Sequence, residues 1–346
     1  MKKIIILAIE TSCDETALSL VEASGTISFP SFQVKESIIS SQIAVHRPFG
    51  GVVPNLAKRE HEKNLPVLFK KLLAANRSLV KNIHCIAVTV GPGLEPALWA
   101  GITFAQTIGK QLKKPVMGVN HLEGHLWSFL LPKKGVRWSK KKIKNLFPAV
   151  GLIVSGGHTM LLRIDGLTKW KKIGETRDDA AGEAFDKVAR LLSLPYPGGP
   201  EISKLAKKGD RTSISFPQPM VHAKNFDFSF SGLKTSVLYY LRDNPSAQKK
   251  DVAASFEHAA VSVLAEKTMR AVSRINAKSV LLSGGVAANT YLREVLLSRT
   301  RKAKIPFIVS EAQYNTDNAS MVGAAAYINL LRKKKYRLRA NGNLGI

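Results

Sequence analysis

Short apolar runs alternate with polar turns along this chain. Residues 3–9 are rich in β-branched side chains, residues 10–16 are polar, and residues 17–21 are apolar again. Runs of this length, bounded by turn residues, are typical of buried strands. The pattern therefore predicts a hairpin whose loop carries hydroxyl and carboxylate groups.

The same order of elements occurs twice. Residues 149–164 predict a second strand, polar turn and strand. Each hairpin is followed later by a strand that runs into glycines and then into a helix, first at residues 86–93 and again at residues 279–285. We interpret the repeat as an ancient duplication. The alternative is that such junctions are common in any α/β protein.

The segments between the predicted strands have a helical period. Apolar residues recur at helical spacing in residues 56–74, 180–192 and 251–274. Residues 196–200 contain two prolines and two glycines and predict a loop. Alternating strands and helices indicate an α/β fold with mostly parallel connections, and the basic residues 132–144 are the best candidate for a connecting segment.

Composition excludes several classes of protein. The chain has 346 residues, 45% of them hydrophobic, which is the ordinary globular fraction. The longest clean apolar run, residues 4–9, is far shorter than the roughly 18 residues of a membrane span. Cys13 and Cys85 are the only cysteines and form no CxxC pair. We therefore expect a cytoplasmic protein that makes no use of a membrane.

Charge adds a candidate partner. Lys and Arg number 52 against 25 Asp and Glu, which gives a net charge of +27. Such a field attracts polyanions, nucleic acid first, although a lysine-rich proteome would give the same number. Trp138 lies within the first of two basic clusters and is a candidate for stacking on an unpaired base; the alternative is a solvated charged loop. The two clusters are Lys133, Lys134, Arg137, Lys140, Lys141, Lys142 and Lys144, and Arg332, Lys333, Lys334, Lys335, Arg337 and Arg339.

Two histidines are the strongest candidates for metal ligands. His121 and His125 are spaced i, i+4, so on a helix they share one face and can bind one metal. Glu123 lies between them rather than next to the first histidine, so the motif is not that of a zinc protease. A third ligand must come from elsewhere, and Asp317, in a polar loop that opens a helix of small residues, is our candidate.

Two glycine turns and one acidic helix are candidates for nucleotide binding. The turn Ser155-Gly156-Gly157 and the turn Ser283-Gly284-Gly285 each follow a predicted strand. Glycines there let backbone N–H groups approach an anion, and the alternative is glycines that only make tight turns. Glu183 and Asp186, at i, i+3, share a helix face and are candidates for binding ribose hydroxyls or a metal-bridged phosphate.

Taken together, these segments resemble the bacterial TsaD family, the tRNA threonylcarbamoyladenosine transferases once called glycoproteases. The resemblance runs in order along most of the chain. The matching segments are residues 9–16, 50–54 with Arg59 and His61, 91–94, 121–125, 154–159, 178–187, 196–200, 228–234, 283–289 and 316–318.

The resemblance implies a fold. It is the duplicated actin-like fold (the ASKHA, ribonuclease H-like class), with two α/β lobes around a central nucleotide cleft. On this basis we expect an N-terminal lobe at residues 1–131, the basic connecting segment at 132–144 and a C-terminal lobe at 145–324. Residues 325–346 would pack back on the N-terminal lobe.

The resemblance also implies a reaction and partners. The family transfers a threonylcarbamoyl group from threonylcarbamoyl-AMP to N6 of the adenosine next to the anticodon, in tRNAs that read codons beginning with A, and releases AMP. Its partners are tRNA, a paralogous TsaB-like subunit and a TsaE-like ATPase. It carries one divalent metal ion per subunit, with Fe²⁺ expected first and Zn²⁺ second.

The family's residues map onto this chain. Its metal ligands match His121, His125 and Asp317. No general base follows from the motifs, and Asp14 and Glu15 are offered only as candidates. The adenylate contacts match Ile153, Val154, Ser155, Gly156, Gly157, Asp186, Gly199 and Asn289, to which the residue patterns add Glu183, Gly284 and Gly285.

The chain departs from the family pattern at one notable point. After Gly91-Pro92-Gly93-Leu94 the family usually has a small residue and glycine, whereas this chain has Glu95-Pro96. Proline stiffens the start of the following helix, so the departure bears on a subunit interface or on donor entry.

Three other functions stay open on the residues alone. A plain ATPase or small-molecule kinase on the same fold is disfavoured because phosphoryl transfer does not need two imidazoles. A metalloprotease is disfavoured because no glutamate adjoins the first histidine. A non-catalytic scaffold that binds tRNA through the basic clusters is the third.

Overall fold

The computed structural model describes residues 3–346, which form two compact units. The first consists of the chain up to Lys144 together with Ser310–Ile346, and the second is Asn145–Val309. Residues 132–144 and 310–324 thus fall in the first unit, whereas the sequence-based boundaries placed them in a connecting segment and in the second lobe. Residues 310–324 belong to the first unit because the helix that begins at residue 319 packs on the first unit's sheet.

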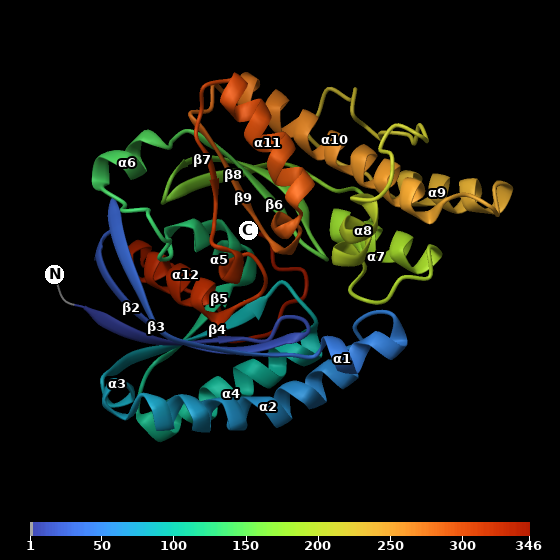
Figure 1. Cartoon of the computed structure of the whole chain (residues 1–346). Coiled ribbons are helices and arrows are strands. Elements are labelled where there is room, and N and C mark those ends of the chain that lie inside the picture. The colour runs from blue at the N-terminus through green and yellow to red at the C-terminus, as the bar shows by residue number, and fades with distance from the viewer. Residues whose placement is uncertain (1–2) are drawn as a thin grey trace. The chain divides into compact units, whose positions relative to one another are not determined.

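The first unit is built on a five-stranded sheet with the order β3-β2-β1-β4-β5. The strands β1, β2 and β3 form an antiparallel meander, and β4 and β5 continue the sheet parallel to β1. β1 is almost wholly buried because helices cover both faces of the sheet (Figure 1). The strands are β1 (Ile4–Glu10), β2 (Glu15–Thr26), β3 (Phe29–Ser41), β4 (Ile83–Gly91) and β5 (Val116–Asn120).

Two pairs of helices cover this sheet. α2 (Pro54–Ala75) and α4 (Glu95–Leu112) pack together on one face. α12 (Ala319–Arg332) lies on the other face, against β1, β2 and β5, and packs on α5 (His121–Trp127). The short helices of this region are α1 (Ile43–His46), α3 (Arg77–Lys81) and α6 (Lys140–Asn145).

The second unit repeats the topology of the first. Its sheet has the order β10-β9-β6-β7-β8, with β6, β7 and β8 antiparallel and β9 and β10 parallel to β6. If the strands of each unit are numbered 1 to 5 in chain order, both sheets have the order 3-2-1-4-5. The predicted duplication is therefore confirmed. The strands are β6 (Ala149–Val154), β7 (Thr159–Gly166), β8 (Lys169–Glu175), β9 (Ser279–Ser283) and β10 (Phe307–Val309).

The helices of the second unit surround α10, which is buried along most of its length. The three helices predicted from the apolar period are confirmed as α2, α7 and α10. The predicted loop at 196–200 is wrong at its second half, because α8 already begins at Gly198, whose N–H donates to Asp186. The helices are α7 (Ala181–Leu191), α8 (Gly198–Ala206), α9 (Ser231–Asp243), α10 (Lys249–Ile275) and α11 (Thr290–Lys302).

None of the helices in residues 3–346 combines the length and the apolar character that crossing a membrane requires.

A buried lysine fastens an irregular segment to α10. The Nζ of Lys267, a side chain with no exposed surface, donates to the carbonyls of Asn225 and Asp227. It thereby holds the segment whose Phe228 forms a β-bridge with Thr176. Burial, and then the charge of Arg270, lower the pKa of Lys267 to about 8.

This pKa makes the stability of the protein pH-dependent. Between pH 8 and the ordinary lysine pKa of 10.5, the folded chain has released a proton that the unfolded chain still holds, so stability rises with pH. Relative to Lys267→Met, we expect the free energy of unfolding of the unmodified chain to increase across this window by up to about 3 kcal/mol. Urea denaturation at several pH values measures this free energy, and Lys302→Met, which changes an exposed lysine, is the control. If the free energy of unfolding changed with pH in the same way in Lys267→Met and in the unmodified chain, Lys267 would not be the group responsible.

Candidate metal centre

The two histidines sit on a short helix that is capped by the strand before it. β5 ends at Asn120, whose Oδ1 accepts the backbone N–H groups of Leu122 at 2.8 Å and Glu123 at 3.3 Å. This capping satisfies two donors of the first turn of α5. His121 and His125 follow one turn apart, both buried, with ring centroids 4.7 Å apart.

Asp317 meets both histidines from a distant part of the chain. Its Oδ1 lies 3.4 Å from Nε2 of His121 and 3.1 Å from Nε2 of His125. Asp317 directly precedes Asn318, whose side chain caps α12 by accepting the N–H of Met321 at 2.9 Å. One ligand atom from each of the three residues lies within 4.8 Å of the others, so the predicted convergence is confirmed.

The donor set fits a divalent transition metal. Two imidazole nitrogens and one carboxylate oxygen are ligands that Fe²⁺ and Zn²⁺ both accept, with positions left open for substrate. Nδ1 of His125 is buried and has no hydrogen-bond partner among the described residues. A Cβ on Gly124 would come within 3.0 Å of Met321, so glycine at this position lets α12 approach the histidine helix closely.

A buried glutamate orients the first histidine. Glu10, at the end of β1, has no exposed surface, and its Oε2 lies 3.2 Å from Nδ1 of His121. The same carboxylate accepts the hydroxyl of Thr89 and the N–H of Ser12, each at 2.6 Å. With Nδ1–H donated to Glu10, Nε2 of His121 is directed at Asp317, the arrangement that commonly supports metal-bound histidine. Sequence reasoning missed Glu10, although it lies inside the motif of residues 9–16.

The charges of this cluster shift the pKa values of its members. Burial lowers the pKa of His121, but the carboxylates of Asp317 and Glu10 outweigh it and raise the pKa to about 9. Burial also raises the pKa of Glu10, and the charge of His121 and its hydrogen bond overcome that effect and lower it. The imidazole and the carboxylates therefore stabilise one another's charged forms.

The candidate bases lie in the loop after β1. Burial, and then the charges of Asp14 and Asp317, raise the pKa of Glu15 to about 10. A carboxyl that holds its proton at neutral pH cannot accept another, so this pKa argues against Glu15 as a base. The loop is held by His61, whose Nε2 donates to the carbonyl of Cys13 at 2.9 Å.

Glu123 takes no part in the ligand cluster. Its carboxylate is buried and accepts from Asn329 at 2.7 Å and from Lys334 at 2.8 Å. It is therefore engaged with the C-terminal part of the chain and is not available as the general base of a protease.

The glycine turns of the second unit lie next to each other. β6 and β9 are parallel neighbours, and Ile153 pairs in register with Ser283, so both turns lie at the carboxyl end of the sheet, where α/β folds bind ligands. Gly284 has φ +93°, and a Cβ there would lie 2.3 Å from the carbonyl oxygen of Val154. Only glycine fits this contact. A Cβ on Gly156, Gly157 or Gly285 would instead meet open space.

The helix after the first turn packs directly on it. The N–H of Gly182 donates to the carbonyl of Ser155 at 3.2 Å, and a Cβ on Gly182 would clash with that oxygen at 2.6 Å. Glu183 forms an ion pair with Lys187 at 2.8 Å. Asp186 instead accepts the N–H of Gly198 at 2.7 Å, so these two carboxylates, predicted to act together, have different partners.

Asn289 is held more tightly than the motif suggests. Its Oδ1 caps α11, and its Nδ2 donates to Ser203 at 2.9 Å and to Glu257 at 2.8 Å. Both hydrogens of Nδ2 are used in these bonds, so Nδ2 can donate to an adenylate only if one of them is exchanged. Sequence reasoning missed Glu257, a buried carboxylate in the first half of α10.

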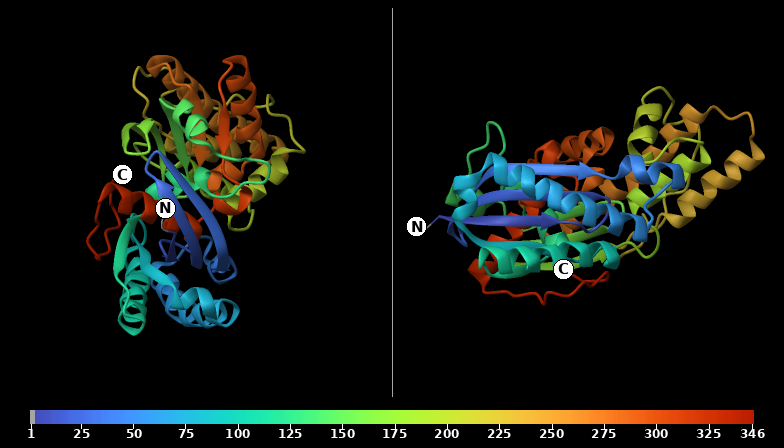
Figure 2. Two further views of the ribbon diagram at one scale, coloured as in Figure 1. Left: turned by 90° about the vertical axis from the view of Figure 1, so that its left-hand side faces the viewer. Right: turned by 90° about the horizontal axis from the view of Figure 1, so that it is seen from below.

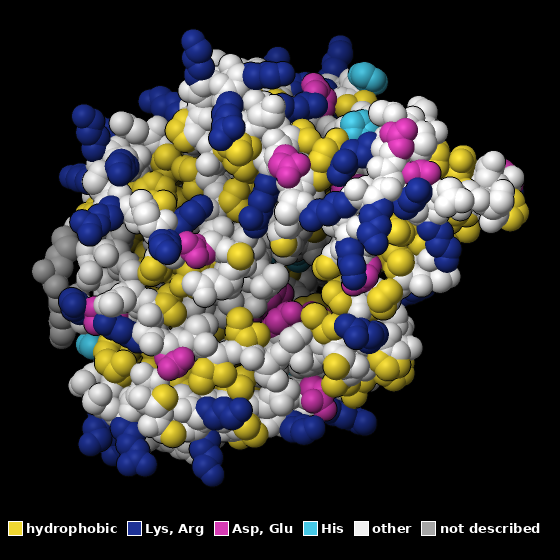
Figure 3. Space-filling model, in the orientation of Figure 1, with side chains coloured by type: hydrophobic (Ala, Val, Ile, Leu, Met, Phe, Trp, Pro, Cys, Tyr) yellow, Lys and Arg dark blue, Asp and Glu magenta, His cyan; other side chains and the backbone are white. Residues whose placement is uncertain are grey.

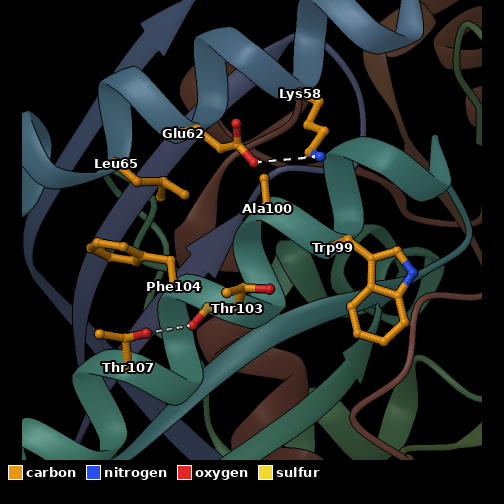
Figure 4. Close-up of a pocket in the computed structure, with 8 residues that line it drawn as sticks. All are labelled: Lys58, Glu62, Leu65, Trp99, Ala100, Thr103, Phe104 and Thr107. Atoms are coloured by element: carbon orange, nitrogen blue, oxygen red, sulfur yellow. Dashed lines mark hydrogen bonds and ion pairs between the residues drawn. The ribbon is translucent and has the colours of Figure 1, made fainter.

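A separate groove lies between α2 and α4 of the first unit. It has a volume of about 420 Å³ and is lined mainly by Leu65, Phe104 and Trp99, with an ion pair between Lys58 and Glu62 at its edge (Figure 4). None of the residues of the metal centre or of the glycine turns lines this groove, so it is separate from the site described above.

Comparison with known proteins decides the family. The family model described as TsaD, tRNA N6-adenosine threonylcarbamoyltransferase, matches residues 33–324. The chain belongs to the TsaD family. It is therefore a transferase of the class that modifies tRNA, and the resemblance stated from the motifs is confirmed.

Curated relatives agree over nearly the whole chain. A tRNA N6-adenosine threonylcarbamoyltransferase of Moorella thermoacetica is 46% identical over 332 residues, covering 95% of this chain and 92% of the relative. The protein of that name from Thermosipho melanesiensis is 45% identical, covering 93% and 94%. The one from Clostridium perfringens is 44% identical, covering 99% and 98%.

Solved structures agree on the fold. HypF of T. kodakarensis superposes with a TM-score of 0.60 at 15% identity; the match covers 95% of this chain but only 48% of HypF. The activator of 2-hydroxyisocaproyl-CoA dehydratase from Clostridium difficile gives a TM-score of 0.51 at 14% identity and covers 95% and 96%. Together with the duplicated topology, these likenesses confirm the actin-like fold class. The nucleotide cleft between the lobes stays a prediction.

The three converging residues predict a measurable metal affinity. In a Co²⁺ titration of the metal-stripped protein, we expect Asp317→Ala and His125→Ala to weaken binding by about 100-fold or more, because each removes one of three ligands. His222→Ala, which removes an exposed histidine, is the matched control. Equal affinity in all four proteins would place the metal elsewhere.

Proposed function

We propose that this protein transfers the threonylcarbamoyl group of threonylcarbamoyl-AMP to N6 of the adenosine beside the anticodon, in tRNAs that read codons beginning with A, and releases AMP. Membership of the TsaD family supports the reaction class. The single structural observation that carries the proposal is the convergence of His121, His125 and Asp317, because a plain kinase or a scaffold has no need of a buried two-histidine, one-carboxylate cluster.

The donor explains why no protein nucleophile is needed. Threonylcarbamoyl-AMP is a mixed anhydride, so AMP is a good leaving group. The exocyclic amine of adenine is a poor nucleophile, and holding it next to the carbonyl carbon supplies much of the rate. The main task of the protein is then to bind and orient both substrates.

The second unit is suited to the adenylate. We assign the turn from Ile153 to Gly157 to the phosphate, because Gly156 and Gly157 are exposed and face open space at the end of β6. Backbone N–H groups there can stabilise the charge that develops on the leaving phosphate. The remaining proposed contacts to the adenylate are Glu183, Asp186, Gly199, Gly284, Gly285 and Asn289.

The first unit is suited to the metal. His121, His125 and Asp317 would hold it, and Glu10 fixes the ring of His121. When bound, the metal supplies a Lewis acid that polarises the carbonyl of the threonylcarbamoyl group. We propose Fe²⁺ first and Zn²⁺ second as its identity, since both suit the donor set.

The basic side chains are suited to the tRNA. Lys and Arg are spread over the face shown in Figure 3, with few acidic groups among them. Lys140, Lys141 and Lys142 are exposed at the start of α6, and we propose that they contact tRNA phosphates. Trp138 packs edge-to-face on Phe129 with centroids 5.7 Å apart and is only partly exposed, so we assign it to packing rather than to base stacking.

The family relationship also bears on partners and compartment. We propose that a TsaB-like paralogous subunit and a TsaE-like ATPase act with this chain, and that it works in the cytoplasm on tRNA. Co-purification of the tagged chain with each candidate subunit, in the presence of ATP, tests the complex.

Reconstitution tests the reaction. The chain, its two partner subunits, tRNA and threonylcarbamoyl-AMP should yield N6-threonylcarbamoyladenosine, detected by mass spectrometry of digested tRNA. We expect Asp317→Ala to lower the yield by about 100-fold or more through loss of a metal ligand, with His222→Ala unchanged. Full activity of Asp317→Ala would remove the metal from the mechanism. Rapid ATP hydrolysis by the chain without tRNA would favour a plain ATPase.

A charge reversal tests the tRNA surface. Changing Lys140, Lys141 and Lys142 to Glu should weaken tRNA binding and lower the slope of log affinity against log salt by about 0.7–0.9 per lost phosphate contact. The control is the same charge change at Lys70, Lys71 and Lys81, which are exposed elsewhere on the first unit. Equal losses of tRNA affinity in the two variants would mean that tRNA binding depends only on net charge and not on this surface.

A further inference from the structure

The helix that carries the histidine pair is anchored by the C-terminal part of the chain. Glu123 lies between the two histidines and has no exposed surface. Its Oε2 accepts from Nδ2 of Asn329 at 2.7 Å, and its Oε1 accepts from Nζ of Lys334 at 2.8 Å. Arg332 approaches the same oxygen at 3.6 Å. One buried carboxylate thus joins α5 to the end of α12 and the residues after it.

A second contact joins the tail to the start of the same helix. Asn120 caps α5 with its Oδ1, and its Nδ2 donates to the carbonyl of Gly345 at 2.8 Å. The side chain that fixes the first turn of the histidine helix is therefore itself held by the penultimate residue of the chain.

The tail between these contacts is fastened along its length. The N–H of Asn341 donates to Val90 at 2.9 Å, and the N–H of Gly93 donates to Gly342 at 3.3 Å. The N–H of Gly342 also donates to Glu95 at 3.1 Å, the residue at which this chain departs from the family pattern. Ala340 is buried in the core of the first unit, and the extended tail is visible in Figure 2.

The helix needs such support. α5 has seven residues, and a helix this short is not stable on its own. Its carboxylate Glu123 is wholly buried, and a buried charge that loses its partner is strongly destabilising. The geometry of metal ligands depends on residues behind them, whose loss typically weakens metal binding by about 10- to 100-fold.

We propose that the C-terminal segment, residues 329–345, clamps α5 and thereby sets the metal affinity of the histidine pair, with Glu123 and Lys334 as its positioning residues. The proposal rests on the proposed metal site and deepens it. The family model ends at residue 324, before every clamp residue of this segment. The C-terminal side of the clamp therefore lies outside the family match, whereas Asn120 and Glu123 lie within it.

The test measures Co²⁺ binding rather than activity. Lys334→Met removes the nearer of the two cations that face Glu123, the other being Arg332, and Lys335→Met removes a neighbouring exposed lysine. In titrations well below the melting temperature of each protein, we expect Lys334→Met to weaken Co²⁺ binding about 10-fold and to shift the visible d–d bands, which report ligand geometry. Lys335→Met should match the unmodified chain in both its Co²⁺ affinity and its visible spectrum.

A double variant separates positioning from simple loss of stability. Glu123→Gln should weaken Co²⁺ binding in the same way, and the combination with Lys334→Met should be little worse than Glu123→Gln alone, because both act through one contact. A chain that ends at Gly342 loses the Gly345 contact but keeps Ala340 in the core, and we expect a smaller loss of affinity in the same direction.

The outcomes are distinguishable. A lowered melting temperature in Lys334→Met, with unchanged Co²⁺ affinity and spectrum, would overturn the clamp and leave the metal site standing. Equal effects of Lys334→Met and Lys335→Met would also overturn it. No Co²⁺ binding by the unmodified chain would overturn the metal site and the clamp together.

Discussion

The contact of one carboxylate with two buried imidazoles is the constraint on which this structure depends. Asp317 is 192 residues from His125 along the chain and further still from His121, so α5 and the start of α12 must be brought together before the cluster exists. Two features of the fold achieve this. Both helices lie on the same face of the first sheet, and Gly124 lets Met321 approach α5 closely, since a Cβ at this position would come within 3.0 Å of the Met321 side chain. The ligand cluster is therefore a product of helix packing.

The duplicated topology explains why the two units present different chemistry from the same plan. In both sheets the meander leads into two parallel strands. In the second unit, the ends of β6 and β9 carry glycine turns with open space above them. In the first unit, the end of β1 carries Glu10 and the end of β5 carries Asn120, two side chains that orient the histidines. Glu10 lies at the strand end that is equivalent to the end of β6, so these two ends hold a polar side chain in one unit and backbone groups in the other. Asn120 lies on β5, the equivalent of β10, and β4, the equivalent of β9, leads into a glycine turn of its own at residues 91–93.

The features that could be predicted from the sequence are those that depend on local periodicity. The histidine pair could be found because the helical period alone puts i and i+4 on one face, and the duplication could be found because strand and turn signals are local. β3 was missed because Pro30 and its many polar residues interrupt the apolar run, although the strand pairs with β2 along its length. Glu10 and Glu257 were missed because their roles depend on partners 111 and 32 residues away, and no local pattern marks a carboxylate that folding will bury.

The charges of the buried carboxylates Glu10 and Asp317 bear on how the cluster would accommodate a metal ion. Without a cation, Glu10 and Asp317 surround the protonated His121, which is why its pKa rises to about 9. Binding of a divalent ion requires Nε2 of His121 to be free, so that proton must leave. The two carboxylates, Asp317 and Glu10, would then match the charge of a divalent ion held by the two neutral imidazoles. The orienting glutamate thus has a second role, since without it the buried cluster with its ion would carry one uncompensated positive charge.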